Sequence, residues 1–255
     1  MKFAPVLSQK YDPASLSDYH LILAHEVVAD IQYAEYYSNL GEEHTIILDN
    51  GTVENGSVQV GLVDEALRIL NRKVICVAPD FLGDKDNTLE ASTEFLRKCN
   101  LPEDEVMIVP QGKTWKEWVE CFELFEKIEG FRWVGLPRIA EDFDGGGRSW
   151  IHQNAVKIHR RTNGMNRSLR FHLLGIQHTI DEVEWAKHFN KSILGVDSSA
   201  PLKAASASVM CKDVEDFRTL KDEVGYQKDL VFKVQNRIKE LTEYYSFIGR
   251  PYDGS

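Results

Sequence analysis

The sequence predicts an α/β fold, a single (β/α)8 barrel of the TIM type with additional helices at its C-terminal end. Short apolar runs rich in β-branched residues alternate with longer stretches of helical periodicity. That alternation is typical of a parallel sheet covered by helices. The length of 255 residues suits a barrel built as one unit. Because no linker, repeat or low-complexity tract divides the sequence, we expect one domain over residues 1–255.

Seven strands are predicted from the apolar runs, and an eighth is expected further along the chain. The predicted strands cover residues 20–28, 45–49, 74–78, 106–109, 131–136, 171–176 and 192–196, with the eighth near 205–210. Helical periodicity covers residues 62–70, 89–99, 115–128 and the charged segment 214–247. Thr114 and Glu117 have the spacing of a capping box, which predicts a helix start at Trp115.

Composition and charge exclude several protein classes. The chain has 30 Lys plus Arg against 40 Asp plus Glu, a net charge of -10 and 43% hydrophobic residues, which excludes disordered, collagen-like and coiled-coil proteins. No run reaches the ~18 apolar residues of a membrane helix, and the N-terminus lacks the apolar core of a signal peptide. The cysteines are far apart, so we expect reduced thiols and a cytoplasmic location, the host cytoplasm for a viral protein. They are Cys76, Cys99, Cys121 and Cys211.

Polar residues stand where the predicted strands end. Asp49 closes the second strand, Asp80 follows the third, Gln111 follows the fourth and Asp197 follows the seventh. Since catalytic groups of a parallel barrel come from the carboxyl ends of its strands, these side chains are expected at one mouth. Each aspartate alone is equally well explained as a helix cap. Three acids at one mouth repel one another unless a substrate or a shared proton compensates, which favours a functional site.

Five short motifs carry a resemblance to a known family. ILDNG, PQG, VGLP, HLLGI and GVDSS occur in the order and approximate spacing of the queuine and archaeosine tRNA-guanine transglycosylases. The chain most resembles the short bacteriophage and bacterial relatives that insert 7-deazaguanines into DNA. The resemblance runs from about Leu21 to Pro201. It implies a barrel enzyme that exchanges one base for another.

The resemblance also implies roles for two aspartates. The residue matching Asp197 attacks the anomeric carbon of a guanosine, expels guanine and forms a covalent glycosyl-enzyme intermediate. An incoming 7-deazaguanine then displaces the enzyme, so two inversions give net retention. The residue matching Asp49 acts as the general acid and base for the leaving and entering bases.

The base-reading residues are implied in the same way. Asp80, Gln111 and the backbone of Gly135 match the positions that read the base, and Leu136 stands beside them in the VGLP motif. A carboxylate accepts from the N1–H and 2-amino group of guanine, and an amide or backbone N–H serves O6. Gly112 and Gly135 would let the backbone approach a flat heterocycle closely, although both are also explained as turn glycines.

A basic stretch follows the fifth predicted strand. Residues 145–172 carry six cations and no Asp or Glu, which leaves a net charge of -16 for the rest of the chain. Such a concentration predicts contact with a phosphate backbone, the alternative being a solvated helix with structural arginines. The cations are Arg148, Lys157, Arg160, Arg161, Arg167 and Arg170. Residues 144–147, Asp-Gly-Gly-Gly, are expected to form a loop over the substrate, and Phe143 and Trp150 either stack on a base or lie in the core.

The expected partners are DNA, with its guanine flipped out or single-stranded, and a free 7-deazaguanine base of the preQ0 or preQ1 kind. The tRNA enzymes carry a C-x-C-x-x-C plus His zinc site near the C-terminus, where this chain has only Cys211. We therefore expect no zinc and no other cofactor, and tRNA is the less favoured substrate. No membrane partner is expected, and the oligomeric state stays open.

Three alternatives remain from the sequence. One is a tRNA-guanine transglycosylase. A second is a barrel glycoside hydrolase, which would also use one carboxylate as nucleophile and one as general acid. That interpretation would leave the basic stretch and Gln111 unexplained. A third is a non-catalytic nucleic-acid-binding partner, against which the presence of both Asp49 and Asp197 argues. Some histidines could touch substrate, but isolated histidines near strand ends are more often structural. These are His25, His152, His172 and His178.

Overall fold

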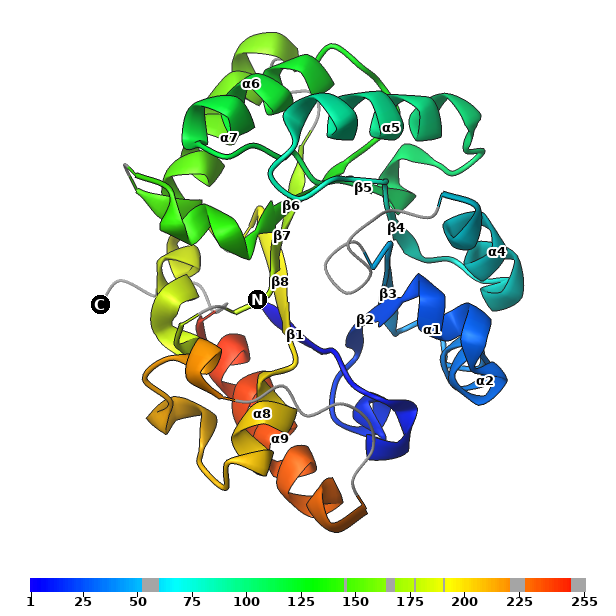
Figure 1. Cartoon of the computed structure of the whole chain (residues 1–255), viewed down its shortest axis with the longest axis vertical. Coiled ribbons are helices and arrows are strands. Elements are labelled where there is room, and N and C mark those ends of the chain that lie inside the picture. Colours follow the sequence, from blue (N-terminus) through cyan, green and yellow to red (C-terminus); the bar gives the residue numbers. More distant parts are fainter. Residues whose placement is uncertain are drawn as a thin grey trace.

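The computed structural model describes residues 1–51, 60–144, 146–163, 168–176, 178–189, 191–220 and 228–248. Eight parallel strands lie in the order β1-β8-β7-β6-β5-β4-β3-β2 and curl into a nearly closed barrel, which confirms the predicted α/β barrel (Figure 1). The strands are β1 (Lys2–Pro5), β2 (Tyr19–Leu23), β3 (Thr45–Asp49), β4 (Ile75–Val77), β5 (Val106–Ile108), β6 (Trp133–Pro137), β7 (Arg170–Leu174) and β8 (Ile193–Ser198).

Helices form an outer ring around the strands (Figure 1). The α-helices are α1 (Ala24–Ala29), α2 (Ile31–Ser38), α4 (Val60–Leu70), α5 (Lys85–Lys98), α6 (Trp115–Phe125), α7 (Gly147–Asn163), α8 (Ala200–Ser206) and α9 (Val231–Ile248). Short 3-10 helices include η4 (Arg138–Asp142), η5 (Ile180–Phe189), η6 (Cys211–Asp213) and η7 (Phe217–Thr219). None of the described helices is both long and apolar enough to cross a membrane.

Side chains bridge the seam between the first two strands. The Ser17 hydroxyl donates to the carbonyl of Phe3 at 2.7 Å and accepts from the N–H of Tyr19 at 3.2 Å. The Lys2 ammonium pairs with Asp18 at 2.7 Å beside it. These contacts bring β1 against β2, so the ring of strands is nearly complete.

Two strand predictions were wrong. Residues 205–210 form the end of α8 and a turn, and the eighth strand is β1 at the N-terminus. A strand of four residues that ends at Pro5 gives too short an apolar run to be recognised. The predicted strand 20–28 also ran too far, because β2 ends at Leu23 and α1 begins at Ala24. A continuous apolar run does not by itself separate a buried strand from a helix turn.

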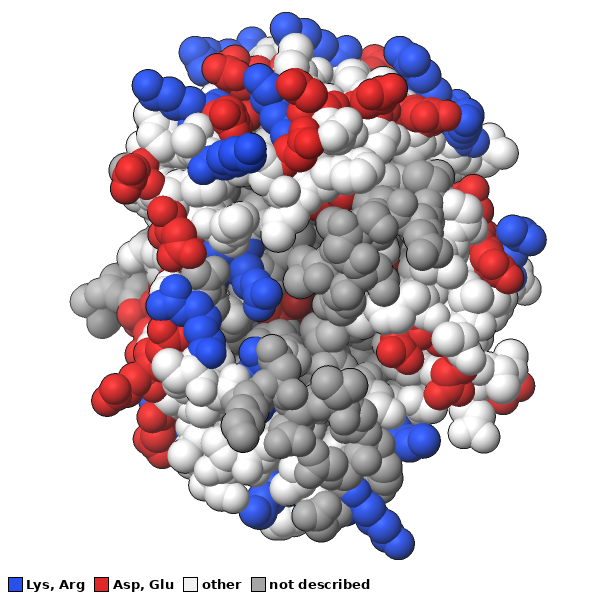
Figure 2. Space-filling model, in the orientation of Figure 1, with Lys and Arg blue, Asp and Glu red and all other residues white. Residues whose placement is uncertain are grey.

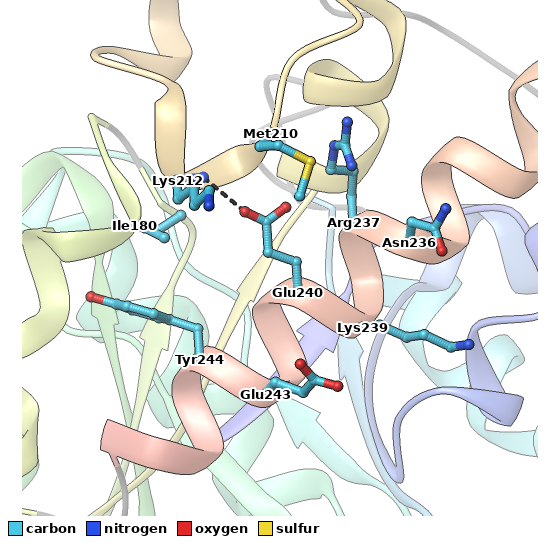
Figure 3. A pocket seen from close by; sticks show the side chains of 9 residues that line it. All are labelled: Ile180, Met210, Lys212, Asn236, Arg237, Lys239, Glu240, Glu243 and Tyr244. Atoms are coloured by element: carbon cyan, nitrogen blue, oxygen red, sulfur yellow. Dashed lines mark hydrogen bonds between the residues drawn. The ribbon is translucent and has the colours of Figure 1, made fainter.

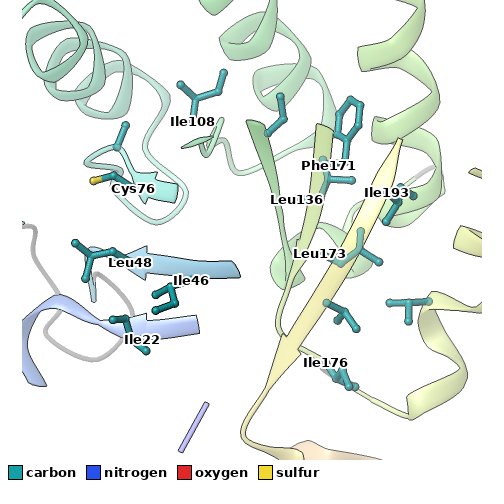
Figure 4. Packing of buried hydrophobic residues seen from close by; sticks show 14 of the residues in the cluster. Ile22, Ile46, Leu48, Cys76, Ile108, Leu136, Phe171, Leu173, Ile176 and Ile193 are labelled. Carbon is teal, nitrogen blue, oxygen red and sulfur yellow. The ribbon is translucent and has the colours of Figure 1, made fainter. Parts of the chain in front are cut away.

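The strands separate two packing layers. Side chains on their outer faces pack against the surrounding helices (Figure 4), as Ile46 and Leu48 of β3 do. Side chains on their inner faces, such as Ile47 of β3 and Met107 of β5, fill the barrel. Successive residues of a strand point to opposite faces, so every second residue faces the lumen.

The predicted capping box of α6 is present, but its glutamate bonds a different backbone N–H than expected. The Thr114 hydroxyl accepts from the N–H of Glu117 at 3.3 Å, as expected. The Glu117 carboxylate accepts from the N–H of Lys113 at 2.7 Å, one residue earlier than in a standard capping box. All four cysteines are free thiols, and three of them are buried.

Candidate functional site

The carboxyl ends of the strands bring the predicted acids to one mouth. Ile47 lies in the inner cluster of the barrel, so Asp49, two residues later on β3, faces the lumen as well. The same alternation places Asp197 of β8 on the lumen side, because Gly195 faces the ring of Tyr19 there. The space-filling view shows a hollow at the centre of the ring with acidic side chains on its floor (Figure 2).

Asp197 is held through one of its two oxygens. Its Oδ1 accepts from His172 Nε2 at 2.9 Å and from the N–H of Gly175 at 3.1 Å. Within the described part of the chain, no hydrogen bond reaches Oδ2. The side chain is 11% exposed, so the carboxylate is largely buried without being sealed. An oriented carboxylate with one oxygen unengaged has the form required of a nucleophile or a general base.

A second hydrogen bond extends this contact across the lumen. The Tyr19 hydroxyl of β2 lies 2.9 Å from His172 Nδ1 of β7. Burial, and secondarily the charge of Asp197, raise the pKa of Tyr19 well above its usual value, so the hydroxyl stays protonated and donates. The Asp197 carboxylate can only accept, so His172 Nε2 carries a proton, and Nδ1 of the neutral imidazole accepts from the Tyr19 hydroxyl. A glycine is required at position 195 beside these hydrogen-bonded side chains, because a Cβ there would overlap the Tyr19 ring.

A separate polar network joins the neighbouring strand ends. Asp80 accepts from Asn50 Nδ2 at 2.7 Å through Oδ1 and from Gln111 Nε2 at 2.5 Å through Oδ2. The Gln111 amide oxygen accepts from the N–H of Gly83 at 3.2 Å. The N–H of Asn50 donates to Asp49 Oδ1 at 2.9 Å. The structure therefore brings Asp49, Asp80 and Gln111 together as predicted.

Two residues of the site were missed or undervalued in the sequence. Asn50 stands in the ILDNG motif, yet its role as the link between Asp49 and Asp80 depends on a contact between two different strands. His172 stands in HLLGI, and an isolated histidine at a strand end gives no sign of its partner. In both cases the partner lies on another strand or in the loop that follows one, so the spacing of the motif alone does not reveal the pair.

The glycines of the VGLP and PQG motifs are required by packing, and their predicted approach to a base stays a prediction. A Cβ on Gly135 would lie 2.8 Å from Leu174 Cδ1, so this glycine leaves room for the lumen packing. A Cβ on Gly112 would lie 2.6 Å from the backbone nitrogen of Trp118, so the loop needs a glycine to approach α6. The Leu136 side chain points outward into the layer beneath the helices (Figure 4), so only the backbone of this residue faces the mouth, and its substrate contact stays a prediction.

The structure corrects the predicted role of Arg148 in the basic stretch. Its side chain is 0% exposed and pairs with Glu141 at 2.7 Å and Glu182 at 2.6 Å. Its guanidinium also donates to the carbonyls of Leu174 and Gly175, at 3.3 and 2.8 Å. Every one of these partners lies within the protein, so the predicted phosphate contact of Arg148 is wrong. The residue instead ties η4 and η5 to the loop that carries Gly175.

The other basic residues lie away from the mouth. Lys157, Arg160 and Arg161 are exposed on α7, which returns the chain from the carboxyl end of β6 to the amino end of β7. Arg170 begins β7 at that amino end and lies over the ring of Trp133 at 5.5 Å. The basic stretch therefore runs down the outside of the barrel, and Arg167 lies outside the described residues.

The structure describes only part of the predicted loop at residues 144–147, but it describes both aromatic neighbours of that loop. The predicted loop includes residue 145, which lies outside the described residues. Phe143 is buried, and Trp150 packs edge-on against Trp115 with ring centroids 4.4 Å apart. Both rings belong to the core cluster or lie against it, so the core interpretation holds over stacking on a base.

A second hollow lies on the outside of the barrel. A pocket of about 620 Å³ opens between α9 and the segment around η6, lined among others by Lys212, Arg237 and Glu240 (Figure 3). The Glu240 carboxylate accepts from the N–H groups of Cys211 and Lys212, and Arg237 Nε donates to the carbonyl of Val209 at 2.6 Å. These hydrogen bonds hold η6 against α9, so the pocket lies where these two helices pack together. No group of His, Cys, Asp and Glu side chains within the described ranges is arranged to hold a metal ion.

Comparison with known proteins adds a fold relationship. No protein-family model matches the sequence, and no curated protein matches it. Solved structures match in fold, among them the crystal structure of a Coccidioides immitis protein described as a candidate fructose-1,6-biphosphate aldolase. That match has a TM-score of 0.54 and 12% sequence identity, and it covers 98% of this chain and 89% of that chain. At this identity the likeness concerns the barrel fold alone.

Proposed function

We propose that this protein is a guanine transglycosylase that acts on DNA and exchanges guanine for a 7-deazaguanine base through a covalent intermediate on Asp197. The observation that carries the proposal is the state of the Asp197 carboxylate. His172 and Gly175 fix one of its oxygens, while within the described residues the other has no hydrogen bond. Asp49 faces the same lumen from the carboxyl end of β3. The motif resemblance to the transglycosylases supplies the reaction.

The reaction uses the two aspartates in turn. Asp197 Oδ2 attacks C1′ of the target nucleotide as the bond from C1′ to N9 of guanine breaks, and Asp49 supplies the proton that the departing guanine needs. The entering 7-deazaguanine gives its N9 proton to Asp49, and its N9 displaces Asp197 from C1′. Each step inverts C1′, so the configuration is retained, and both aspartates return to their starting protonation states.

Asp80 and Gln111 are suited to reading the base. A carboxylate accepts from the N1–H and 2-amino group that guanine and 7-deazaguanine share, and the Gln111 amide can donate to O6. The oxygens of Asp80 already accept from Asn50 and Gln111. Because each carboxylate oxygen has two lone pairs, the base can add its donors without breaking these bonds. Asn50 would then orient Asp80 for the base.

The test is base exchange with purified protein. Single-stranded DNA and unmodified tRNA are incubated separately with labelled guanine, and incorporation is measured alongside mass spectrometry of the nucleosides formed with a 7-deazaguanine. We expect incorporation into DNA and a covalent DNA adduct on a denaturing gel. Asp197→Asn should abolish both, while Asp86→Asn, an exposed change on α5, should leave both unaltered. An adduct that survives in Asp197→Asn would show that another residue is the nucleophile.

The alternatives give different outcomes in the same assay. Incorporation into tRNA and not DNA would favour the tRNA enzymes, and hydrolysis of oligosaccharides without base exchange would favour a glycoside hydrolase. Binding of DNA with neither reaction would favour a non-catalytic partner. Any of these three results would overturn the proposal.

A further inference from the structure

Two glycines with positive φ support the mouth. Gly175 has a φ of 73° and donates its N–H to Asp197, while Gly83 has a φ of 70° and donates its N–H to Gln111. This left-handed conformation is open to glycine at little steric cost. Each glycine therefore presents a backbone donor to a side chain of the proposed site, one on each side of β5 and β6.

A long cationic side chain lies over each of these glycines. A Cβ on Gly175 would lie 3.2 Å from Arg138 Cδ, and a Cβ on Gly83 would lie 3.7 Å from Lys113 Cγ. The missing side chains thus leave room for the aliphatic stems of Arg138 and Lys113. Such side chains commonly pack their stems on the protein and keep the charged head in water.

Both cations belong to the mouth. Arg138 directly follows Pro137, the last residue of β6, and Lys113 comes two residues after Gln111 at the end of β5. Both residues are exposed, and neither has an ion-pair partner in the part of the chain that the structure describes. They differ in this from Arg148, whose guanidinium is buried between Glu141 and Glu182.

We propose that Arg138 and Lys113 bind the phosphates of a single-stranded nucleic acid whose target nucleotide enters the mouth. This inference rests on the proposed function, because that reaction needs a nucleotide within reach of Asp197. The floor of the mouth carries Asp49, Asp80 and Asp197, which repel a polyanion. Arg138 and Lys113, which we call the rim cations, offset that repulsion where the phosphodiester backbone would pass. Figure 2 shows Lys and Arg side chains beside the central hollow.

The rim accounts for phosphate binding better than the basic stretch does. Lys157, Arg160 and Arg161 lie toward the end of α7, which approaches the amino ends of the strands. A nucleotide seated at the carboxyl ends would hold its adjoining phosphates near the rim. Contacts to phosphate fix the register of a nucleic acid without reading its sequence, which suits groups placed around a base-reading site.

The test is the salt dependence of DNA binding by the full chain. A fluorescent single-stranded oligonucleotide with one guanine among thymines is titrated at several salt concentrations with wild type, Arg138→Gln, Lys113→Gln and the double variant. Glutamine keeps part of each stem over its glycine and removes the charge. Each single change should weaken binding roughly tenfold at low salt. Each should also reduce the slope of log affinity against log salt by about 0.7, and the double variant by about twice that.

Controls separate this inference from the proposed function. Lys157→Gln removes one exposed charge on α7 and should leave the affinity and the salt slope unaltered. Arg138→Lys keeps a positive charge at this position, so its salt slope should stay close to that of wild type. Unaltered slopes in both rim variants, an equal loss in Lys157→Gln, or no DNA binding by wild type would overturn the inference. Rim variants that behave as expected in a protein without guanine exchange would refute the proposed function alone. Guanine exchange with unaltered DNA affinity in the double variant would refute the rim assignment alone.

Discussion

His172 Nε2 lies 2.9 Å from Asp197 Oδ1, and the two residues come from neighbouring strands of the barrel. The bond is fully buried on the histidine side, and its far nitrogen is bonded to Tyr19 in turn. Buried polar groups such as His172 and Tyr19 are tolerated among apolar lumen residues because they are hydrogen-bonded to one another and to Asp197. The bond from His172 fixes the direction of the Asp197 carboxylate, on which the proposed reaction depends.

Replacing His172 should therefore affect catalysis through Asp197. In His172→Ala, Asp197 Oδ1 loses one of its two donors and the Tyr19 hydroxyl loses its described partner. Hydrogen bonds to charged groups contribute about 1.5–3 kcal/mol, so we expect the rate of base exchange to fall roughly 10- to 100-fold. Single-turnover formation of the covalent adduct measures this.

A conservative change gives the matching control. Tyr19→Phe keeps the ring beside Gly195 and removes only the hydroxyl, so it should lower the rate less than His172→Ala does. Nitrogen NMR of His172 should show the Nε2–H tautomer in both wild type and Tyr19→Phe, because the Asp197 carboxylate still accepts from Nε2 in the variant. A wild-type rate in His172→Ala would mean that Gly175 alone is sufficient to orient Asp197.

Asp49 should be needed for proton transfer and not for DNA binding. Asp49→Asn keeps the size of the side chain, and its amide oxygen can still accept the N–H of Asn50. It cannot deliver or take a proton, so base exchange should fall about 10²- to 10⁴-fold. The affinity for a single-stranded oligonucleotide should change little. If exchange in Asp49→Asn stayed within a few-fold of wild type, the general acid and base would have to be sought elsewhere at the mouth.

Much of the barrel and its mouth could be predicted from the sequence. The run Thr-Ile-Ile-Leu-Asp at residues 45–49 is bounded as predicted, because strong β-branched strand residues end at a turn there. Strand ends of a parallel barrel converge, so Asp49, Asp80, Gln111 and Asp197 were placed together from chain order alone. β1 was missed because its stability comes from pairing with β8 and the contacts of Ser17, both distant in sequence.

The error at Arg148 has a different physical origin. Cations close in sequence on a helix point in different directions, since each residue turns the helix by about 100°. Arg148 therefore faces inward to Glu141 and Glu182, whereas Lys157 and Arg160 face solvent. Local charge density in the sequence does not distinguish these cases. Lys113 and Arg138 each stand alone in the sequence, so local charge density does not mark them, although both follow strand ends that meet at the mouth.

The buried position of Arg148 predicts a large loss of stability on its removal. Arg148→Ala leaves Glu141 and Glu182 without their cation, and removing one partner of a buried ion pair costs about 3–5 kcal/mol. Arg160→Ala, on the same helix but exposed, should change the free energy of unfolding by about 0.5 kcal/mol or less. Urea unfolding of the two variants measures the difference. Equal and small effects would mean that the Arg148 pairs are weak or open to water.

Two buried histidines should make the fold sensitive to acid. Burial lowers the pKa of His152 to about 4, because its ring lies against Phe171 and Phe189. Burial, followed by the charge of His44, lowers the pKa of His20 to about 3. Since both values lie below the unfolded value of about 6.5, the unfolded chain takes up protons first as pH falls. These groups therefore contribute stability that is fully present above pH 6.5 and is lost progressively as the pH falls, toward pH 4 for His152 and toward pH 3 for His20.

The measurement is the free energy of unfolding in urea between pH 7 and pH 4. His152 alone should account for a loss on the order of 3 kcal/mol across that range. His152→Gln does not titrate and can keep a hydrogen bond to Ser192, the 3.2 Å partner of His152 Nε2. Its stability should therefore fall less steeply with acid than that of wild type, although it starts lower at pH 7. A variant whose stability parallels that of wild type over this range would show that His152 takes up no proton on unfolding, and the acid sensitivity would then belong to His20 or to other groups.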